Sequence, residues 1–336
     1  MKKAKRLHEL VNAFAGRRVL VLGDLVLDRY ILGTPKRISR EAPVIILRFE
    51  EQRDVPGGAA NAMANVASLG GTVLPVGAVG NDEAGRALLA QLRQRGIDTT
   101  PIAVVPGYRT VTKVRLLAWG AASLRHQVAR YDVEDRLPLA PGADTPLDAA
   151  LTRLAPGASV AAISDYGYGA VTAARVATLR AALPPAALTV ADSRFALHEL
   201  GTVDGATPNL EELTAWAGWT PASDEEVAAA AERLRTSLDA RFVVATRGSQ
   251  GLTVVEANHP PYHLPVYGTN QVVDVTGAGD TVLATLTLAV AAAATPQEAA
   301  FLANLAAGVA VTKLGTATVS PQELHEAIER ASFAEP

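Results

Sequence analysis

The chain has 336 residues, of which 49% are hydrophobic and 19% charged, so its length and composition are those of a globular protein with a sizeable core. A formal net charge of -3 argues against a broad electrostatic surface for nucleic acid or anionic lipid, and the lack of cysteine excludes disulfides, thiolate metal sites and a cysteine nucleophile. The basic N-terminus carries polar residues where a signal peptide needs an apolar core, and the apolar run 281–294 is shorter than the roughly 20 residues of a membrane span. We therefore expect a soluble, cytoplasmic protein whose partners include neither nucleic acid nor a membrane.

From the N-terminus onward, short apolar runs that end in a glycine or a polar residue alternate with helical patterns. The runs are typical of buried strands and occur at 17–24, 72–80, 159–165, 187–192 and 241–248. Helical patterns cover 57–70 and 81–96, the second with a cap at Asn81 and a stop at Gly96. This alternation predicts an α/β fold, with a doubly wound, mostly parallel sheet and helices on both of its faces.

Three other segments alternate only partly between apolar and polar residues. They lie at 45–51, 110–118 and 124–133, and half-buried strands of this kind suit a small second sheet that is exposed on one side.

Polar residues follow several of the predicted core strands. Asp24, Asp165, Asp192 and the segment 246–248 all come directly after apolar runs. Ligands of open parallel sheets bind at the carboxyl ends of the strands, so these residues predict one common cleft.

The segment DVTGAGDTV, residues 274–282, places two glycines and two aspartates before an apolar run. If a helix begins at or just after Gly277, the backbone N–H groups of Gly277, Ala278 and Gly279 point outward, and such groups bind an anion. Asp280 in the first turn is then either a base beside that anion or a residue that stabilises the helix dipole. By itself, the segment also fits a flexible loop or the cap of a buried helix.

The same segment resembles the C-terminal signature of the ribokinase-like (PfkB) family of sugar kinases. Four further stretches resemble motifs of the family, in the family's order: GDLVLD (23–28), PGGAANAMANVASLG (56–70), TPNLEE (207–212) and TRGSQG (246–251). The resemblance covers about residues 17–330. It implies a single ribokinase-like kinase domain over 1–336, with a small β-sheet lid formed by segments at about 30–50 and 104–133. For the lid segments, an ordinary edge hairpin stays an alternative.

The resemblance assigns the chemistry of phosphoryl transfer to particular residues. Gly277, Ala278 and Gly279 would form the anion hole for the transferred group, with Asp280 as the catalytic base. The sugar would be held by residues from the first two motifs, namely Asp24, Gly57, Gly58 and Asn61.

The implied phosphoryl donor is ATP with Mg²⁺. Glu212 would organise the magnesium shell through water, and Asn209 would lie near the phosphates. The loop at the nucleotide would contain Thr246, Gly248 and Gly251.

The resemblance also implies sites for adenine and for K⁺, although the residues at these two sites are less specific to the family. The small-residue helix at 303–315 would let the adenine approach at Asn304 and Gly308, although close helix packing explains the same residues equally well. Asp274 and Thr276 would hold K⁺, and the alternative for Asp274 is the cap of a turn.

Within the family, segments 23–44, 164–171 and 311–321 are most similar to kinase domains that phosphorylate the anomeric hydroxyl of D-glycero-D-manno-heptose 7-phosphate. Two positions depart from that subgroup, which usually has Asp-Pro-Lys where this chain has Asp192-Ser193-Arg194, and often a lysine at Tyr168. The substrate phosphate needs cations, and the candidates are Lys113 and Arg115, which alternate on a predicted lid strand, together with Arg37, Arg40 and Arg194. Each of them alone also fits a solvated surface charge.

Rival functions remain. A dehydrogenase would need a Gly-x-Gly-x-x-Gly turn after the first strand, which VLVLGDLVLD lacks. A sugar or nucleotide sensor on the same fold is expected to lose the base or the anion hole, and a PfkB-family kinase for another sugar, sugar phosphate or nucleoside is the remaining alternative. In bifunctional members a nucleotidyltransferase domain follows the kinase domain, whereas this sequence ends at residue 336, so we expect a kinase alone. We also expect a homodimer paired through its lid.

Overall fold

An eight-stranded sheet forms the centre of the protein in the computed structural model, which describes residues 2–119, 125–138, 145–195, 197–268 and 272–331. In spatial order the strands are β14, β13, β12, β11, β10, β9, β1 and β4. The strands from β4 to β12 pair in parallel, whereas β12, β13 and β14 pair antiparallel. Their bounds are β1 (Arg18–Gly23), β4 (Thr72–Val76), β9 (Val160–Asp165), β10 (Leu188–Ser193), β11 (Gly205–Ala206), β12 (Phe242–Thr246), β13 (Leu252–Glu256) and β14 (Tyr262–Leu264).

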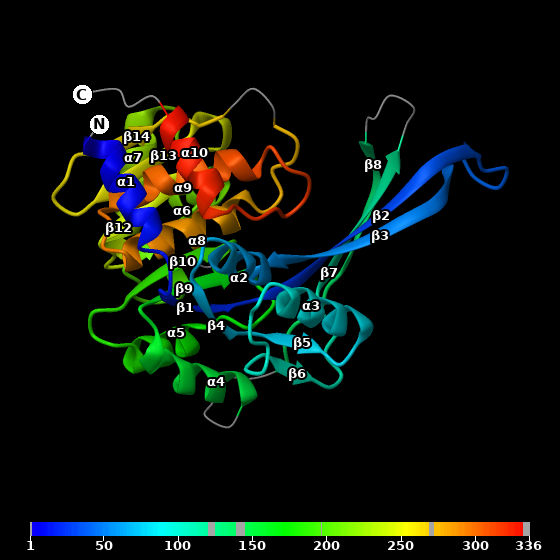
Figure 1. The fold of residues 1–336 in the computed structure, drawn as a ribbon, viewed down its shortest axis with the longest axis horizontal. Coiled ribbons are helices and arrows are strands. Elements are labelled where there is room, and N and C mark those ends of the chain that lie inside the picture. Colours follow the sequence, from blue (N-terminus) through cyan, green and yellow to red (C-terminus); the bar gives the residue numbers. More distant parts are fainter. Residues whose placement is uncertain (1, 120–124, 139–144, 196, 269–271, 332–336) are drawn as a thin grey trace.

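Helices cover both faces of this sheet (Figure 1), as the alternating pattern predicts. Successive residues of a strand point to opposite faces, so Val19 and Val21 of β1 join one hydrophobic core while Leu20 and Leu22 join the other. The first core includes α1 (Lys2–Asn12), α2 (Ala59–Ser68), α3 (Glu83–Gln94), α8 (Ala278–Ala291), α9 (Pro296–Ala310) and α10 (Pro321–Arg330). The second includes α4 (Pro146–Leu154), α5 (Ala173–Ala182), α6 (Leu210–Ala217) and α7 (Asp224–Ser237).

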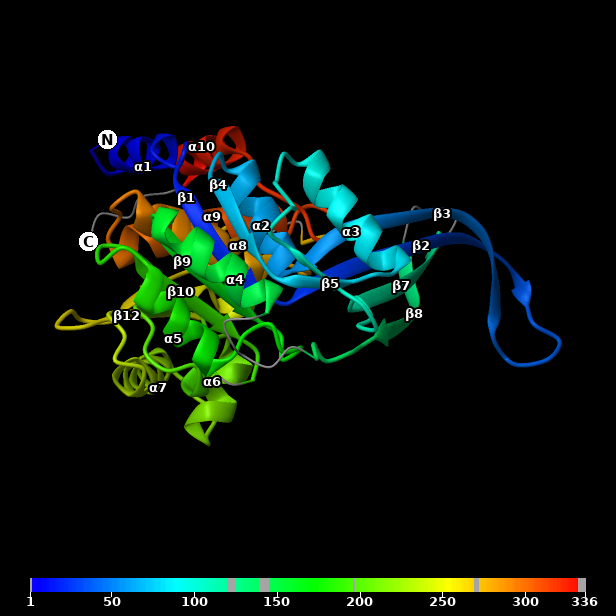
Figure 2. The same ribbon diagram turned by 90° about the horizontal axis from the view of Figure 1, so that it is seen from below.

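A second sheet of four strands, the lid sheet, extends away from this body (Figures 1 and 2). Its order is β3 (Ile45–Gly58), β2 (Leu25–Ile38), β7 (Thr112–Trp119) and β8 (Arg125–Val133). The segments expected to form a lid, at about 30–50 and 104–133, therefore pair with one another in one sheet, except that residues 104 and 105 belong to a separate strand pair. Smaller elements are the parallel pair β5 (Ala78–Gly80) and β6 (Ala103–Val105), and the 3₁₀ turns η1 (Ala155–Gly157), η2 (Leu197–Glu199) and η3 (Gly248–Gln250).

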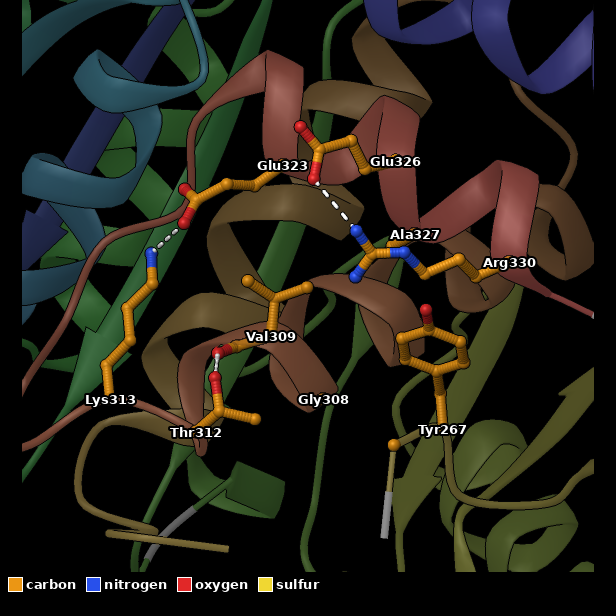
Figure 3. Close-up of a pocket in the computed structure, with 10 residues that line it drawn as sticks. Tyr267, Gly308, Val309, Thr312, Lys313, Glu323, Glu326, Ala327 and Arg330 are labelled. Carbon is orange, nitrogen blue, oxygen red and sulfur yellow. Dashed lines mark hydrogen bonds and ion pairs between the residues drawn. The ribbon is translucent and has the colours of Figure 1, made fainter. Parts of the chain in front are cut away.

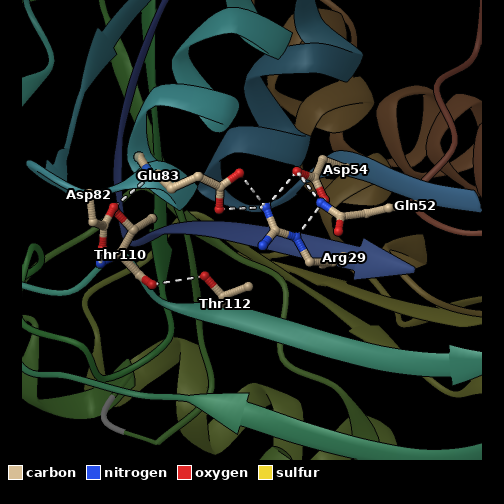
Figure 4. A network of polar contacts seen from close by, with 8 residues as sticks. Arg29, Gln52, Asp54, Asp82, Glu83, Thr110 and Thr112 are labelled. Carbon is tan, nitrogen blue, oxygen red and sulfur yellow. Dashed lines mark hydrogen bonds and ion pairs between the residues drawn. The ribbon is translucent and has the colours of Figure 1, made fainter. Parts of the chain in front are cut away.

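Polar contacts tie the base of the lid sheet to helix α3 (Figure 4). The Arg29 guanidinium of β2 donates to both carboxylate oxygens of Asp54 on β3, at 2.8 and 2.7 Å, and to Glu83 in the first turn of α3 at 3.0 Å. Asp82 accepts from the Gly85 N–H at 2.7 Å and from the Thr110 hydroxyl at 2.7 Å. Two lid strands and the segment that leads into a third are thus held against one helix.

The cap of α3 differs from the sequence prediction. The helix begins at Glu83, and its N-cap is Asp82 rather than Asn81. Both residue types cap helices well. Asp82 is favoured because its second oxygen also accepts the Thr110 N–H at 2.8 Å, a contact between distant segments that local sequence does not reveal.

Candidate active site

Helix α8 begins where the glycine-rich segment predicts. Its N-cap is Gly277, whose φ of 79° lies in the left-handed region that favours glycine, and a Cβ there would come within 2.4 Å of the Asn61 side-chain nitrogen. Within the described residues, the N–H groups of Gly277 and Gly279 have no hydrogen-bond partner, and a Cβ at Gly279 would meet open space. These two groups are available to an anion.

Ala278 departs from the expectation of an outward, unpaired amide. Its N–H donates to the Val275 carbonyl at 3.3 Å, because the chain tightens into a turn just before the helix begins. The bond is long, so the anion hole expected from three amides has two free members and one that is weakly engaged.

The Asp280 carboxylate is buried in the first turn of α8 and is held by two side chains. The Tyr166 hydroxyl donates to one oxygen at 2.9 Å, and the Asn61 amide donates to the other at 2.9 Å. Burial raises the pKa of Asp280 to about 7, although both hydrogen bonds oppose that rise. A carboxylate that titrates near neutral pH suits a base that accepts a proton from a sugar hydroxyl.

Asp24 contacts the backbone of its own chain. Its carboxylate accepts three N–H groups from the segment after β9, those of Tyr166 at 2.9 Å, Tyr168 at 3.0 Å and Ala170 at 2.9 Å. Burial raises the pKa of Asp24 and these three bonds oppose the shift. Asp24 therefore fixes the segment that carries Tyr166, and its contact with sugar hydroxyls stays a prediction.

Asp28 belongs to the site, although the sequence analysis did not single it out. Its side chain is 3% exposed on β2 and forms an ion pair with Arg115 of β7. A Cβ at Gly57 would lie 2.2 Å from an Asp28 oxygen, so this glycine leaves room for the carboxylate. Asp28 also raises the pKa of Asp280, which places the two carboxylates within electrostatic reach. The available signal was a charged residue inside the apolar strand that GDLVLD begins.

The N-terminal motif supplies two further candidates, Gly58, which lies against Asp24, and Asn61, which contacts Asp280. Gly58 has a φ of 55° as the N-cap of α2, and a Cβ there would lie 2.9 Å from the Asp24 carbonyl oxygen. Asn61 is fully buried in α2 and donates to Asp280. Of the predicted sugar-binding residues, Asn61 contacts the base directly, whereas Asp24 and Gly58 contact Tyr166, which donates to the base. The sugar contact itself stays a prediction.

Lys113 and Arg115 share a strand and are both only 8% exposed, so the alternative of solvated surface charges is wrong for them. The Lys113 ammonium lies over the Tyr166 ring at 5.0 Å from its centre. Burial lowers the pKa of Lys113, and the nearby charges of Arg130 and Arg194 act in the same direction while Asp28 opposes them. A buried ammonium among other cations is a ready site for an anionic group.

The other three candidate cations for the substrate phosphate, Arg37, Arg40 and Arg194, are exposed. Arg37 and Arg40 lie at the outer end of the lid sheet, away from Lys113 and Arg115 at its inner end. Arg194 follows β10 and borders a cavity of about 160 Å³ that Glu212 also lines. Of these three candidates, Arg194 alone is close enough to Lys113 to affect its pKa.

Two carboxylates near Arg194 are suited to a divalent cation. Burial raises the pKa of Asp192 well above its usual range, and the neighbouring charge of Glu212 adds to the rise. Burial also raises the pKa of Glu212, although the Asn209 N–H opposes it. Bound Mg²⁺ would stabilise both charged carboxylates, so the residues present fit this ion.

The motif Asn-x-x-Glu is also the start of helix α6. The Asn209 side chain accepts the Glu212 N–H at 2.9 Å, and the Glu212 carboxylate accepts the Asn209 N–H at 2.9 Å, which is a reciprocal capping box. Asn209 forms a parallel β-bridge with Thr246, so the predicted magnesium and nucleotide motifs lie side by side.

Among the predicted nucleotide residues, Gly251 and Asn304 are in close contact with the backbone of their own chain, whereas Gly248 is not. Gly251 has a φ of 87°, and a Cβ there would lie 1.9 Å from the Leu264 carbonyl oxygen, whereas Gly248, with a φ of 54°, faces open space. Asn304 donates to the Pro265 carbonyl at 2.8 Å. The Gly251 and Asn304 contacts are packing contacts, and ATP contact at these positions stays a prediction.

Gly308 borders a cavity of about 300 Å³ between helices α9 and α10 (Figure 3). A Cβ at Gly308 would lie 2.5 Å from the Tyr267 carbonyl oxygen, so close packing does explain this glycine. The cavity is bordered by the Tyr267 ring, and across it Lys313 pairs with Glu323 at 2.6 Å. Its other lining residues are Gly268, Val309, Thr312, Glu326, Ala327 and Arg330.

The segment predicted to hold K⁺ contacts the residues that follow α9. One Asp274 oxygen accepts the Thr276 N–H at 2.9 Å, and the other accepts the Gly315 N–H at 3.0 Å. The turn-cap alternative for Asp274 is therefore confirmed, and K⁺ binding stays a prediction. Across the described residues, no group of three or more His, Cys, Asp or Glu side chains is placed to hold a metal ion.

The protein thus combines an α/β fold and a lid sheet with a helix N-terminus that carries a buried carboxylate. Residues 17–127 and 169–323 match the pfkB family of carbohydrate kinases. The chain belongs to this family. None of the helices in the described ranges is long and apolar enough to span a membrane.

Sequence relatives and solved structures agree with this assignment. The chain is 42% identical over 326 residues to the bifunctional protein HldE of Caulobacter vibrioides and 41% identical over 322 residues to that of Azotobacter vinelandii. These alignments cover 95% and 94% of the chain but only 65% of either relative, so the chain spans about two thirds of their length.

Two solved structures share the fold. Phosphofructokinase-2 from Escherichia coli, in complex with potassium, has a TM-score of 0.73 at 21% identity, with 94% of this chain and 98% of that chain covered. Ribokinase of Arabidopsis thaliana, complexed with ribose and ATP, has a TM-score of 0.72 at 19% identity, with 94% and 100% covered. At these identities the likeness shows the ribokinase-like fold alone.

Proposed function

We propose that the chain is an ATP-dependent sugar kinase that phosphorylates the anomeric hydroxyl of D-glycero-D-manno-heptose 7-phosphate. The observation that carries the kinase reaction is the buried Asp280 carboxylate, whose pKa lies near 7, beside the free N–H groups of Gly277 and Gly279. The choice of sugar is supported by segments 23–44, 164–171 and 311–321 and by the similarity to proteins named HldE.

Phosphoryl transfer depends mostly on positioning and charge stabilisation. Asp280 accepts the proton of the sugar hydroxyl, and the amides of Gly277 and Gly279 donate to the oxygens of the transferred group. Mg²⁺ bound near Asp192 and Glu212 would supply positive charge to the phosphates. Asn61 donates to the Asp280 carboxylate and keeps it in place during proton transfer.

The distal phosphate of the substrate needs a cationic site inside the cleft. Lys113 is the best candidate, because it is buried, lies near Arg194 and Arg130, and forms no ion pair with a carboxylate of the described residues. Arg115 is less available, since it already pairs with Asp28. Arg194 takes the place of the lysine expected in the subgroup, and its planar guanidinium binds a phosphate in a different geometry.

The cavity of about 300 Å³ beside Gly308 is our proposed site for the adenine of ATP. It has the Tyr267 ring at its edge, and its lining residues Thr312 and Lys313 directly follow Val311, whose carbonyl accepts the Asp274 N–H at 3.2 Å. A K⁺ ion near Asp274 and Thr276 would help to hold the segment before the anion hole. Equal activity in K⁺ and in a large organic cation would contradict that ion site.

A homodimer paired through the lid sheet is part of the proposal. The outer lid exposes apolar side chains, and a surface of this kind favours association. They are Ile38, Val44, Ile45, Phe49, Trp119, Val128 and Tyr131. A single monomeric species in light scattering, at the concentrations used for activity, would contradict the dimer.

The decisive experiment measures ADP release from ATP and Mg²⁺ against a panel of acceptors. The panel contains D-glycero-D-manno-heptose 7-phosphate, fructose 6-phosphate, ribose, fructose and adenosine. We expect the heptose phosphate to have the highest kcat/KM. A preference for an unphosphorylated sugar would keep Asp280 as the base but contradict the phosphate site at Lys113, and no turnover with any acceptor would favour a sensor.

A further inference from the structure

Tyr166 lies at the centre of the site, in the segment that follows β9. Its N–H donates to Asp24 at 2.9 Å, and its ring packs against Gly58 at the start of α2, because a Cβ built on that glycine would lie 3.4 Å from the ring. The Lys113 ammonium lies over the ring face. The backbone and the ring of Tyr166 are therefore both fixed by neighbours, and the side chain has little freedom to rotate.

The hydroxyl of this fixed side chain contacts the base directly. It donates to one Asp280 oxygen at 2.9 Å, while Asn61 donates to the other at 2.9 Å. Burial raises the pKa of Tyr166 well above its usual range, and the charge of Asp280 adds to the rise, so the hydroxyl keeps its proton and stays a donor. A donor on each oxygen fixes the rotation of the carboxylate.

We propose that Tyr166 is the positioning residue of the base, with a hydroxyl that orients the Asp280 carboxylate and stabilises its ionised form. This inference rests on the proposed kinase function and deepens it. Because the Lys113 ammonium sits on the same ring, Tyr166 also joins the proposed phosphate site to the base.

Other charges also act on Asp280 and set the background for a test. Asp28 of β2 raises its pKa and Lys113 of β7 lowers it, while Asp192 of β10 lies within electrostatic reach. None of these is altered by the change Tyr166→Phe, which removes the hydroxyl and keeps the ring for Lys113. The effect of this variant therefore isolates one hydrogen bond.

The first arm measures kcat/KM against pH for Tyr166→Phe with the preferred acceptor. Loss of a donor to the carboxylate should raise the pKa of Asp280, and the acid limb should move upward by about one pH unit. We expect about a fivefold loss from this shift near pH 7, most of which is recovered near pH 9. The loss that remains at high pH measures the orienting role of the hydroxyl. A loss of equal size at every pH, or an unmoved limb, would overturn the proposal.

Tyr108→Phe is the matched control. Tyr108 is another buried tyrosine, and it has no hydrogen bond to Asp280. The same chemical change at this position should leave the acid limb where it is in the unchanged protein. A limb that moves equally in both variants would also overturn the proposal.

The second arm does not depend on turnover. The side-chain carboxyl carbons of aspartate are labelled with ¹³C, the Asp280 signal is assigned by its absence in Asp280→Asn, and its titration is followed by NMR. We expect a higher pKa for Asp280 in Tyr166→Phe than in the unchanged protein, and an equal pKa would refute the contact. If the unchanged protein phosphorylates no acceptor, the proposed function fails while this titration still decides the role of the hydroxyl.

Discussion

The inner and outer ends of the lid sheet share the same strands and differ in what they bury. At the inner end, Asp28, Lys113 and Arg115 are between 3% and 8% exposed. At the outer end, Ile38 and Phe49 are 70% and 63% exposed. This reverses the usual distribution, in which charged groups face water and apolar groups are buried. The inner end buries its charges near Asp280, whose pKa both Asp28 and Lys113 affect, whereas the outer end exposes apolar side chains.

The largest expected effect comes from removal of Asp280, the base on α8 that the charges of the inner end act on. Asp280→Asn keeps the shape of the side chain but cannot accept the proton, so we expect kcat to fall on the order of 10²–10⁴-fold. The control is Asp239→Asn, at an exposed position with a φ of 52° that asparagine tolerates. Near-full activity of Asp280→Asn would contradict general-base catalysis, whereas a matching loss in the control would point to damage unrelated to the site.

The two ends should also differ in the strength of their ion pairs. Arg115→Met leaves the Asp28 carboxylate buried and unpaired, which should lower the free energy of unfolding by about 3–5 kcal/mol. Arg48 pairs with Glu50 at the outer end, where both side chains are exposed, and Arg48→Met should cause no measurable change. Urea unfolding of both variants measures the difference. Equal effects would mean that the inner pair is as well solvated as the outer one.

A pair of glycines sharpens the comparison within the cleft. Gly277→Ala forces a left-handed φ on alanine and pushes a methyl group against Asn61, so we expect about a tenfold or greater loss in kcat as Asn61 moves from Asp280. Gly279→Ala meets open space and should fold normally, with its main effect on the KM for ATP. Steady-state kinetics on both variants separates the two effects. Equal losses in kcat would show that the space at Asn61 is not what Gly277 provides.

Local patterns explain why much of the fold could be predicted. Alternating strands and helices and the start of α8 at Gly277 depend on neighbouring residues or on the period of apolar positions. The lid sheet was expected from the family resemblance instead, because its strands β2 and β7 pair across a long stretch of chain. The contacts around Asp280 depend on segments far apart in the chain. Tyr166 is 114 residues away and Asn61 is 219 residues away, so no spacing rule links them to the base.

Asp28 and Asp82 were missed for the same reason. Asp28 looks like the end of a motif until Arg115 is placed beside it, and Asp82 is chosen over Asn81 as a cap through its contact with Thr110. Asp24 stood out in the sequence because it follows a strand, yet its carboxylate accepts three backbone amides. Position at the end of a strand predicts a place in the cleft, whereas the contacts of each carboxylate are set by tertiary packing.

The pH dependence of the unchanged protein is the mildest test of the buried site. Burial raises the pKa of Asp280 to about 7, so its carboxyl is mostly protonated below that pH and cannot accept the proton of the sugar. We expect kcat/KM to rise with pH through about 7 and then to level off, with about half of the limiting value at that point. An acid limb near pH 4, the ordinary range of an aspartate in water, would mean that the lid and α2 do not shield Asp280 from water during catalysis.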